Sequence, residues 1–337
     1  MENDRVSRPE KIAPSDISII VQGPICGATD GRAGPSVTGR ALNSIRKHFP
    51  GAELILSTWE GSDVSGLNFE VLIMSKDPGA GICNERYGLR HNVNRQIVST
   101  TAGLKAASRK YAMKIRTDLL FTHSNCIDYL SRYNLRSNEY RLTKERILVV
   151  STTSVNPRKS FQLPYHPCDW FYFGLKADLV DIFDIPLFIE PEFTHWFKTR
   201  KYPKNHPNFD NTARYAQESY IWYSFCKKRL NIEFDHLCDT SHNNVEISEK
   251  TFANNLVVLT PSQLGIVSLK YEPNYANSWH MYTFTEWKRL YNKYCRGELP
   301  ASFDYAKVLY GSAYFVSVLR SKIGAGIRFL RGYSAIR

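Results

Sequence analysis

Several patterns that identify common classes of protein are missing from this chain of 337 residues. No Gly-x-Gly-x-x-Gly follows the first predicted strand, and no Gly-x-x-x-x-Gly-Lys-Ser/Thr occurs at all, so the usual phosphate cradles of dinucleotide-binding and P-loop proteins are absent. No run of 18 apolar residues is present, so no transmembrane helix is predicted. Residues 1–15 are polar, contain two prolines and lack the apolar stretch of a signal peptide, and we expect them to be disordered.

Paired cysteines are missing as well. The seven cysteines are scattered and odd in number, and no Cys-x-x-Cys occurs among them. This pattern favours reduced thiols in a cytosolic protein over a disulfide framework or a zinc knuckle.

Acidic residues are too few to balance the basic ones, and the net charge is +12. Such an excess attracts polyanions, among them nucleic acid, acidic lipid and phosphorylated substrates. Residues 305–337 contain no acidic side chain, and apolar and aromatic residues alternate there with six lysines and arginines. Two interpretations of the C-terminal segment 266–337 stay open: a basic amphipathic helical segment on an anionic membrane surface, or a helix packed on the core with a solvated basic face.

The first 120 residues alternate between strand and helix patterns. Hydrophobic runs predict strands at 17–22, 52–57, 69–75 and 111–115, and periodic apolar stripes predict helices at about 36–48 and 91–110. Further strands are expected at 145–155 and 169–175, and a helix at 212–230. This order predicts an α/β domain with a mainly parallel, Rossmann-like central sheet.

Polar clusters follow four of these strands. The first strand ends at Gln22-Gly23-Pro24, the second near Thr58, the third runs into Asp77 and the fourth ends at Arg116-Thr117-Asp118. Because ligands bind beyond the carboxyl ends of parallel strands, the four clusters are expected to share one site.

Asp118 raises a specific question, because a carboxylate at a buried strand's end needs a partner. One interpretation is a Mg²⁺ or Mn²⁺ site in which the cation neutralises a diphosphate, with Arg116 or Lys114 contacting phosphate oxygens. The other is an internal ion pair between Arg116 and Asp118. Spacing alone leaves both open.

Several stretches together resemble the WavE lipopolysaccharide synthesis family and, more broadly, GT-A glycosyltransferases. The resemblance covers roughly residues 17–225 and is carried by "ISIIVQGPI", "SIRKHFPGAELILSTWEGSD", "KDPG", "NVNRQIVSTTAGLK", "YAMKIRTDLLF", "DWFYFG" and "QESYIW". It implies a GT-A-like domain at 16–265, with a nucleotide-sugar half at 16–123 and an acceptor half at 124–265. The implied activity is transfer of a sugar from a nucleotide donor, UDP- or CMP-linked, to a lipopolysaccharide, O-antigen or capsule glycan.

The resemblance also implies roles for single residues. Asp118 takes the place of the last acid of the Asp-x-Asp metal motif, whereas Arg116 replaces the first acid, which puts strict dependence on Mn²⁺ or Mg²⁺ in doubt. Glu218 is the expected general base, with Asp169 as its rival or as a ligand of the acceptor hydroxyl, and His242 is a candidate for the metal ligand that such enzymes supply late in the chain. The implied donor-binding residues are Gln22, Gly23, Pro24, Thr58, Asp77, Asn94, Arg95, Lys114 and Arg116.

Two other classes remain possible from the residues alone. A basic nucleic-acid-binding protein would explain the charge, although no RRM, KH or helix-turn-helix pattern is present. A nucleotidyltransferase of the same sheet class would use the same strand-end site. For the glycosyltransferase, a lipid-linked acceptor would place the protein on the cytoplasmic face of the inner membrane, held by the basic C-terminus.

Overall fold

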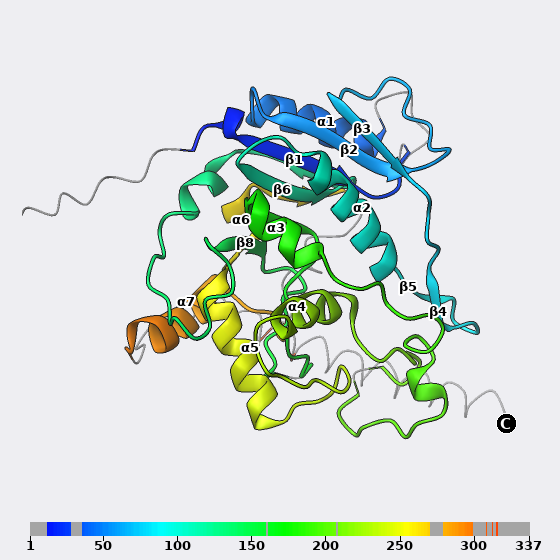
Figure 1. Ribbon diagram of the computed structural model, residues 1–337, viewed down its shortest axis with the longest axis vertical. Helices are drawn as coiled ribbons and strands as arrows, with labels where there is room; N and C mark the ends of the chain where they lie inside the picture. The colour runs from blue at the N-terminus through cyan, green and yellow to red at the C-terminus, as the bar shows by residue number, and fades with distance from the viewer. Residues whose placement is uncertain are drawn as a thin grey trace, which may run out of the picture.

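The computed structural model describes residues 12–27, 36–159, 161–206, 208–269 and 279–298, and the single positions 308, 312 and 315. A seven-stranded sheet in the order β10-β8-β9-β6-β1-β2-β3 forms its centre (Figure 1). The strands are β1 (Ile17–Gln22), β2 (Glu53–Trp59), β3 (Val71–Ser75), β6 (Tyr111–Arg116), β8 (Ile147–Val150), β9 (Phe171–Leu175) and β10 (Leu256–Leu259). Only β9 runs against its neighbours β6 and β8, so the predicted α/β fold with a mainly parallel sheet is confirmed.

Helices cover both faces of this sheet. Figure 1 shows α1 on one face and α2 on the other, and α2 and α3 pack together against the sheet. Further helices, α4, α5 and α7, lie beyond α3 and beside β10. Their bounds are α1 (Val37–His48), α2 (Val93–Ala106), α3 (Lys176–Phe183), α4 (Gln217–Lys227), α5 (His242–Asn255), α6 (Pro261–Leu264) and α7 (Phe284–Tyr291).

Small elements complete the description. The hairpin β4 (Gly81–Asn84) and β5 (Leu89–His91) lies at the edge of the molecule, where it is hydrogen-bonded to residues 210–215. Strand β7 (Leu119–Phe121) pairs with β11 (Ile266–Ser268). Short helical turns are η1 (Pro14–Asp16), η2 (Asn125–Tyr129), η3 (Trp196–Lys198) and η5 (Asn292–Arg296). None of the helices in the described ranges has the length and apolar character needed to cross a bilayer.

The local sequence explains why the first half forms as predicted. Every residue of β1 is buried, as expected of a central parallel strand covered on both faces. Helix α1 begins where the Ser36 side chain accepts a hydrogen bond from the Gly39 amide at 3.0 Å, and the chain turns at Gly51, whose φ is +83°. The buried stripe of α1 includes Ala41, Leu42 and Ile45.

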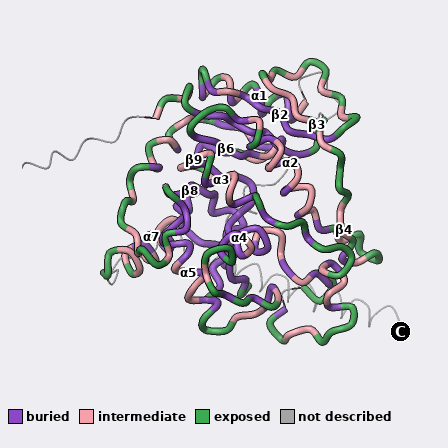
Figure 2. The backbone as a smooth tube through the Cα atoms, in the orientation of Figure 1, coloured by how far each residue is buried: buried purple, intermediate pink, exposed green. Residues whose placement is uncertain are grey.

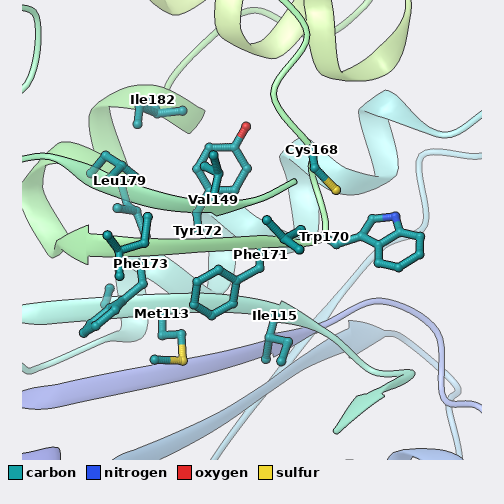
Figure 3. Packing of buried hydrophobic residues seen from close by; sticks show 14 of the residues in the cluster. Met113, Ile115, Val149, Cys168, Trp170, Phe171, Tyr172, Phe173, Leu179 and Ile182 are labelled. Atoms are coloured by element: carbon teal, nitrogen blue, oxygen red, sulfur yellow. The ribbon is translucent and has the colours of Figure 1, made fainter. Parts of the chain in front are cut away.

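The core is continuous across the sheet. Figure 2 shows buried backbone through the central strands and α4, with exposed chain in the outer loops. Along β9, Phe171 and Phe173 pack on one side of the strand and Tyr172 on the other, as Figure 3 shows. Trp170, next to β9, extends past the strand end, and this is the edge at which the candidate site lies.

Several sequence predictions differ from the structure in extent. The strand expected at 145–155 ends at Val150, because the chain turns at Thr153, which has a φ of +59°. The helix expected at 212–230 begins only at Gln217, since residues 212–216 instead make contacts with neighbouring loops, such as the hydrogen bond from the Thr212 hydroxyl to the Thr194 carbonyl. Most of the predicted C-terminal segment, including its basic stretch, lies outside the described residues.

Candidate active site

A cavity of about 490 Å³ opens at the carboxyl ends of the parallel strands. The ends of β1, β2, β3 and β6 all contribute to it, together with the start of α2, the segment before β9 and the first turn of α4. The strand ends therefore share one site, as the sheet topology requires. The lining residues are Gln22, Gly23, Pro24, Cys26, Trp59, Asp77, Asn92, Arg95, Gln96, Arg116, Thr117, Asp118, Thr153, Asp169, Trp170, Gln217 and Glu218.

The turn after β1 is fixed to the end of β6. Gly23 has a φ of +121°, a conformation that side chains disfavour. The Thr117 hydroxyl donates to the Pro24 carbonyl at 2.7 Å, and the Thr117 amide donates to the Gln22 carbonyl at 3.2 Å. These bonds place Arg116 and Asp118 beside the Gln22-Gly23-Pro24 turn.

Arg116 and Asp118 form a two-point ion pair on the cavity wall. Nε and Nη2 of Arg116 donate to the two carboxylate oxygens of Asp118 at 3.0 and 2.6 Å. The Asp118 side chain is only 4% exposed and that of Arg116 is 22% exposed. The Arg116 guanidinium lies 5.1 Å from the centre of the Trp170 ring, which supports it from one side. The internal pair that the sequence left open is therefore present, and it borders the cavity.

Asp77 and Arg95 repeat this arrangement on the other side of β1. Nε and Nη2 of Arg95 donate to the Asp77 carboxylate at 2.7 and 2.6 Å, and Nη1 donates to the Asn92 side chain at 3.1 Å. The hydrogen bonds from Arg95 lower the pKa of Asp77 and raise the pKa of Arg95 itself. Each pair thus presents a fixed guanidinium next to a neutralised carboxylate.

A second group of polar side chains lines the cavity from the segment before β9 and the first turn of α4. The Asp169 carboxylate accepts a hydrogen bond from the Gln96 side chain, and its backbone carbonyl accepts one from the Lys114 ammonium. Glu218 comes from the first turn of α4, and its Oε2 lies 3.4 Å from Nε2 of His166. Asp169 and Glu218, which lie roughly 50 residues apart in the chain, therefore bring two carboxyl groups to the same cavity.

Burial shifts the pKa values of Glu218, Lys114 and His166. Burial, and after it the nearby Asp169 carboxylate, raises the pKa of Glu218 to about 8. Burial also lowers the pKa of Lys114 to about 8 and that of His166 to about 4, so His166 is neutral at pH 7. An acid whose pKa is near the working pH can both accept and release a proton, and this property points to Glu218 as a proton-transfer group.

Three predicted donor residues do not line the cavity. Thr58 is buried with its hydroxyl 3.3 Å from that of Ser62, although the next residue, Trp59, does line the cavity. The Asn94 side-chain amide is hydrogen-bonded to both the amide and the carbonyl of Phe188, so it joins α2 to the 184–188 loop. Lys114 is fully buried behind Asp169.

The residues of the predicted metal site are not brought together. His242 is the first residue of α5, its side chain is 83% exposed, and it pairs with Glu246 at 3.3 Å instead of lining the cavity. Both oxygens of Asp118 already accept hydrogen bonds from a cation. Across the described ranges, no group of three or more His, Cys, Asp or Glu side chains is arranged to hold a metal ion. The described side chains of this cavity therefore form no ready-made site of three or more protein ligands for a divalent cation.

Other lining residues were not singled out from the sequence. Thr153 and Gln217 lie in segments predicted as regular strand and helix, and Gln96 sits on α2 without any motif to mark it. Trp59 follows Thr58 in a predicted strand-end cluster and Trp170 follows Asp169, and this adjacency to predicted site residues was the only available signal for them.

Comparison with known proteins identifies the family of this chain. The model of the family described as "WavE lipopolysaccharide synthesis" matches residues 17–322, and the chain belongs to that family. No curated protein matches the sequence. Among solved structures, the chain is similar to the inositol-1-phosphate CTP transferase from T. maritima, at 13% identity, with 72% of this chain and 98% of that chain covered and a TM-score of 0.32.

Proposed function

We propose that this member of the lipopolysaccharide synthesis family is a glycosyltransferase that moves a sugar from a nucleotide-sugar donor to a lipopolysaccharide, O-antigen or capsule glycan. The observation that carries the proposal is that one cavity brings together two kinds of group. Two arginine–aspartate pairs lie near the strand ends, and the carboxyl groups of Asp169 and Glu218 line the same cavity. The volume of about 490 Å³ lies in the range of small-molecule sites.

Arg95 and Arg116 suit the phosphate part of a donor. Arginine binds phosphate oxygens through paired, charge-assisted hydrogen bonds, and Arg95 and Arg116 lie at the strand ends where phosphorylated ligands bind in such sheets. Trp59 and the Gln22-Gly23-Pro24 turn line the same part of the cavity and would border the nucleoside. UDP- and CMP-linked sugars are the donors we expect.

Glu218 is the proposed general base. In the reaction, the acceptor hydroxyl oxygen bonds to the anomeric carbon while the bond from that carbon to the nucleotide breaks, and Glu218 takes the hydroxyl proton. A carboxyl group with a pKa of about 8 is a stronger base than an ordinary carboxylate, and it is mostly ionised, and so able to accept the proton, above that pH. Asp169 would orient the acceptor, since its carboxylate is fixed by Gln96 and lies near enough to Glu218 to raise its pKa.

The test is a transfer assay on the purified protein with a panel of nucleotide sugars and short glycan acceptors. Replacing Glu218→Gln should lower the rate of transfer about 10²- to 10⁴-fold while nucleotide binding stays within a few-fold of wild type. Asp235→Asn is a suitable control, because that side chain is 65% exposed and does not line the cavity. Near-normal turnover of the Glu218 variant would reject this residue as the base.

The same assay separates the alternative activity. A glycosyltransferase using a UDP-linked donor releases a nucleoside diphosphate, and one using a CMP-linked donor releases CMP, whereas a nucleotidyltransferase releases pyrophosphate from a nucleoside triphosphate. Pyrophosphate release with no sugar transfer would favour the nucleotidyltransferase. Attachment to the cytoplasmic face of the inner membrane through the basic C-terminus, and an acceptor linked to lipid, remain part of the proposal and rest on the sequence alone.

A further inference from the structure

We infer that the donor's diphosphate is held by Arg116 and Arg95 without a divalent cation. This inference rests on the proposed function, because it concerns how the same cavity binds its nucleotide. It assigns Asp118 the task of positioning Arg116, in place of the metal-binding task that the Asp-x-Asp resemblance implies.

The first observation is the state of Asp118. A hard cation such as Mg²⁺ or Mn²⁺ needs carboxylate lone pairs that point to it. In Asp118, Oδ1 accepts from Nε of Arg116 at 3.0 Å and Oδ2 from Nη2 at 2.6 Å, and the side chain is 4% exposed. A cation bound to either oxygen would lie close to the positive guanidinium. Removing Arg116 from the pair to admit the cation would break two charge-assisted hydrogen bonds.

The second observation is that the other cavity carboxylates are also committed. Asp77 is held by two hydrogen bonds from Arg95, and Asp169 by the Gln96 side chain. Glu218 lies beside His166, with Oε2 and Nε2 separated by 3.4 Å. The described part of the chain holds no cluster of three or more metal ligands, and these contacts leave the two arginines as the groups placed to hydrogen-bond a diphosphate.

The third observation is the orientation of the two guanidinium groups. An aspartate binds one edge of each guanidinium through two hydrogen bonds. Both arginine side chains line the cavity and are partly exposed, 22% for Arg116 and 34% for Arg95. The Trp170 ring lies against Arg116, and the Asn92 side chain takes a further hydrogen bond from Arg95. A guanidinium held in this way loses little conformational freedom when it binds phosphate, which favours tight and specific contact.

The experiment is calorimetric titration of the full chain with UDP, CDP, GDP, ADP and CMP, once in EDTA and once with Mn²⁺. We expect at least one nucleoside diphosphate to bind in EDTA with a dissociation constant within about threefold of its value in Mn²⁺. The double change Arg116→Gln with Asp118→Asn removes both charges and keeps two polar side chains of similar shape. It should weaken binding roughly 10- to 100-fold in both buffers, because charge-assisted bonds to phosphate are lost.

Single changes refine the result. Arg116→Lys keeps the charge but loses the fork and should give a smaller loss than the double change, and Arg95→Gln should also weaken binding. Arg46→Gln is the matched control, because Arg46 also pairs with a carboxylate, that of Glu70 at 2.5 Å, but lies outside the cavity lining. Thermal unfolding of each variant shows whether it is folded.

The outcomes separate this inference from the proposed function. Binding that requires Mn²⁺ and is lost in the Asp118→Asn protein would overturn the arginine clamp and leave the glycosyltransferase intact. Affinity unchanged in a folded double variant would overturn it too. Binding of CMP but of no diphosphate would overturn it while keeping a nucleotide donor. No nucleotide bound in either buffer would count against both.

Discussion

The two halves of the molecule are held together in different ways. In the half that we propose binds the nucleotide (the nucleotide half, residues 16–123), the parallel strands β1, β2, β3 and β6 pair along their length and are covered by α1 and α2. In the half that we propose binds the acceptor (the acceptor half, residues 124–265), long stretches without regular structure run between short strands. Buried polar side chains fix these stretches by binding backbone groups, so regular pairing supports one half and side-chain caps support the other.

Arg146 and Asn255 show the second mode most clearly. Arg146 is 1% exposed, and its guanidinium donates to the carbonyls of Tyr133, Leu135, Ala253 and Leu256. The Asn255 side chain accepts from the amides of Leu142 and Thr143 and donates to the carbonyl of Tyr140. Two side chains therefore hold the 133–143 segment against α5, and no sequence motif announces either of them.

The site reflects the same contrast. The nucleotide half supplies ion pairs whose members lie at the ends of regular strands or on α2, so their partners are fixed by local register. The acceptor half supplies Asp169 and Glu218 from segments that only tertiary packing brings near Lys114 and His166. The sheet therefore sets the positions of the two ion pairs, whereas burial shifts the pKa of Glu218.

The largest effect on this contrast should come from Arg146→Met. The methionine fills similar space but leaves four backbone carbonyls without their donor, and a buried unsatisfied polar group is costly. We expect a loss of roughly 2–5 kcal/mol in the free energy of unfolding, measured by urea denaturation.

Arg132→Met is the matched control for this change. Arg132 lies in the same half and donates to the Asp128 carbonyl at 2.9 Å, but it is exposed, so its loss should cost less than about 1 kcal/mol. Equal effects of the two substitutions would show that capping by buried side chains does not support the acceptor half.

A smaller effect is expected where α2 meets the sheet of the nucleotide half. A Cβ atom at Gly103 would lie 2.4 Å from Cγ2 of Ile20 and 3.2 Å from Cβ of Ser57. Cβ of Ser57 is attached directly to the backbone, and Cγ2 of Ile20 is one bond further out. Because both residues belong to fully paired strands, these atoms cannot move away unless the strands move. Gly103→Ala should therefore lower the free energy of unfolding by about 1–3 kcal/mol, despite alanine's better helix propensity.

Gly174→Ala provides the comparison. Gly174 lies in β9, which stands between β8 and β6 in the sheet. There the nearest atom is Cδ1 of Ile147, also at 2.4 Å, but it is the end of a flexible side chain. Its cost, measured by the same denaturation, should be the smaller of the two. A larger cost for Gly174→Ala would contradict the view that the nucleotide half is the more rigidly packed.

The smallest predicted effect is a shift in pH dependence. Transfer that needs ionised Glu218 should rise with pH and level off above about 8, because that carboxyl is protonated below its pKa. The positive charge of Lys114 lowers the pKa of Glu218, so Lys114→Met should move the rising limb of the pH–rate profile to higher pH, by about one unit or less. Initial rates between pH 6 and 10 measure the shift.

The control is Lys110→Met, which removes an exposed lysine from the start of the same strand. It should leave the profile in place. A limb that moves to lower pH in the Lys114 variant would contradict the placement of Glu218 beside this charge.

Much of the nucleotide half was predictable because its patterns are local. The strand predicted at 17–22 matches β1 at both ends, and the helix predicted at 36–48 differs from α1 by one residue. In the acceptor half, the strand predicted at 145–155 is β8 with only four residues, and β10 was not predicted. Apolar runs there continue into buried loops. In such loops the hydrophobic residues do not recur with the spacing of a helix or a strand, so their pattern does not show where an element ends.

The sequence by itself determined the alternation of strands and helices, and through it the edge at which the polar strand ends meet. Apolar periodicity and parallel pairing are enough for that, because each depends on neighbours close in the chain or in the sheet. Only the tertiary structure decided that Asp118 is paired with Arg116 on a cavity wall, that His242 lies elsewhere, and that Glu218 is buried near Asp169. The ionisation of a group and its choice of partner depend on desolvation and distance across the fold, and neither is written in the spacing of residues along the chain.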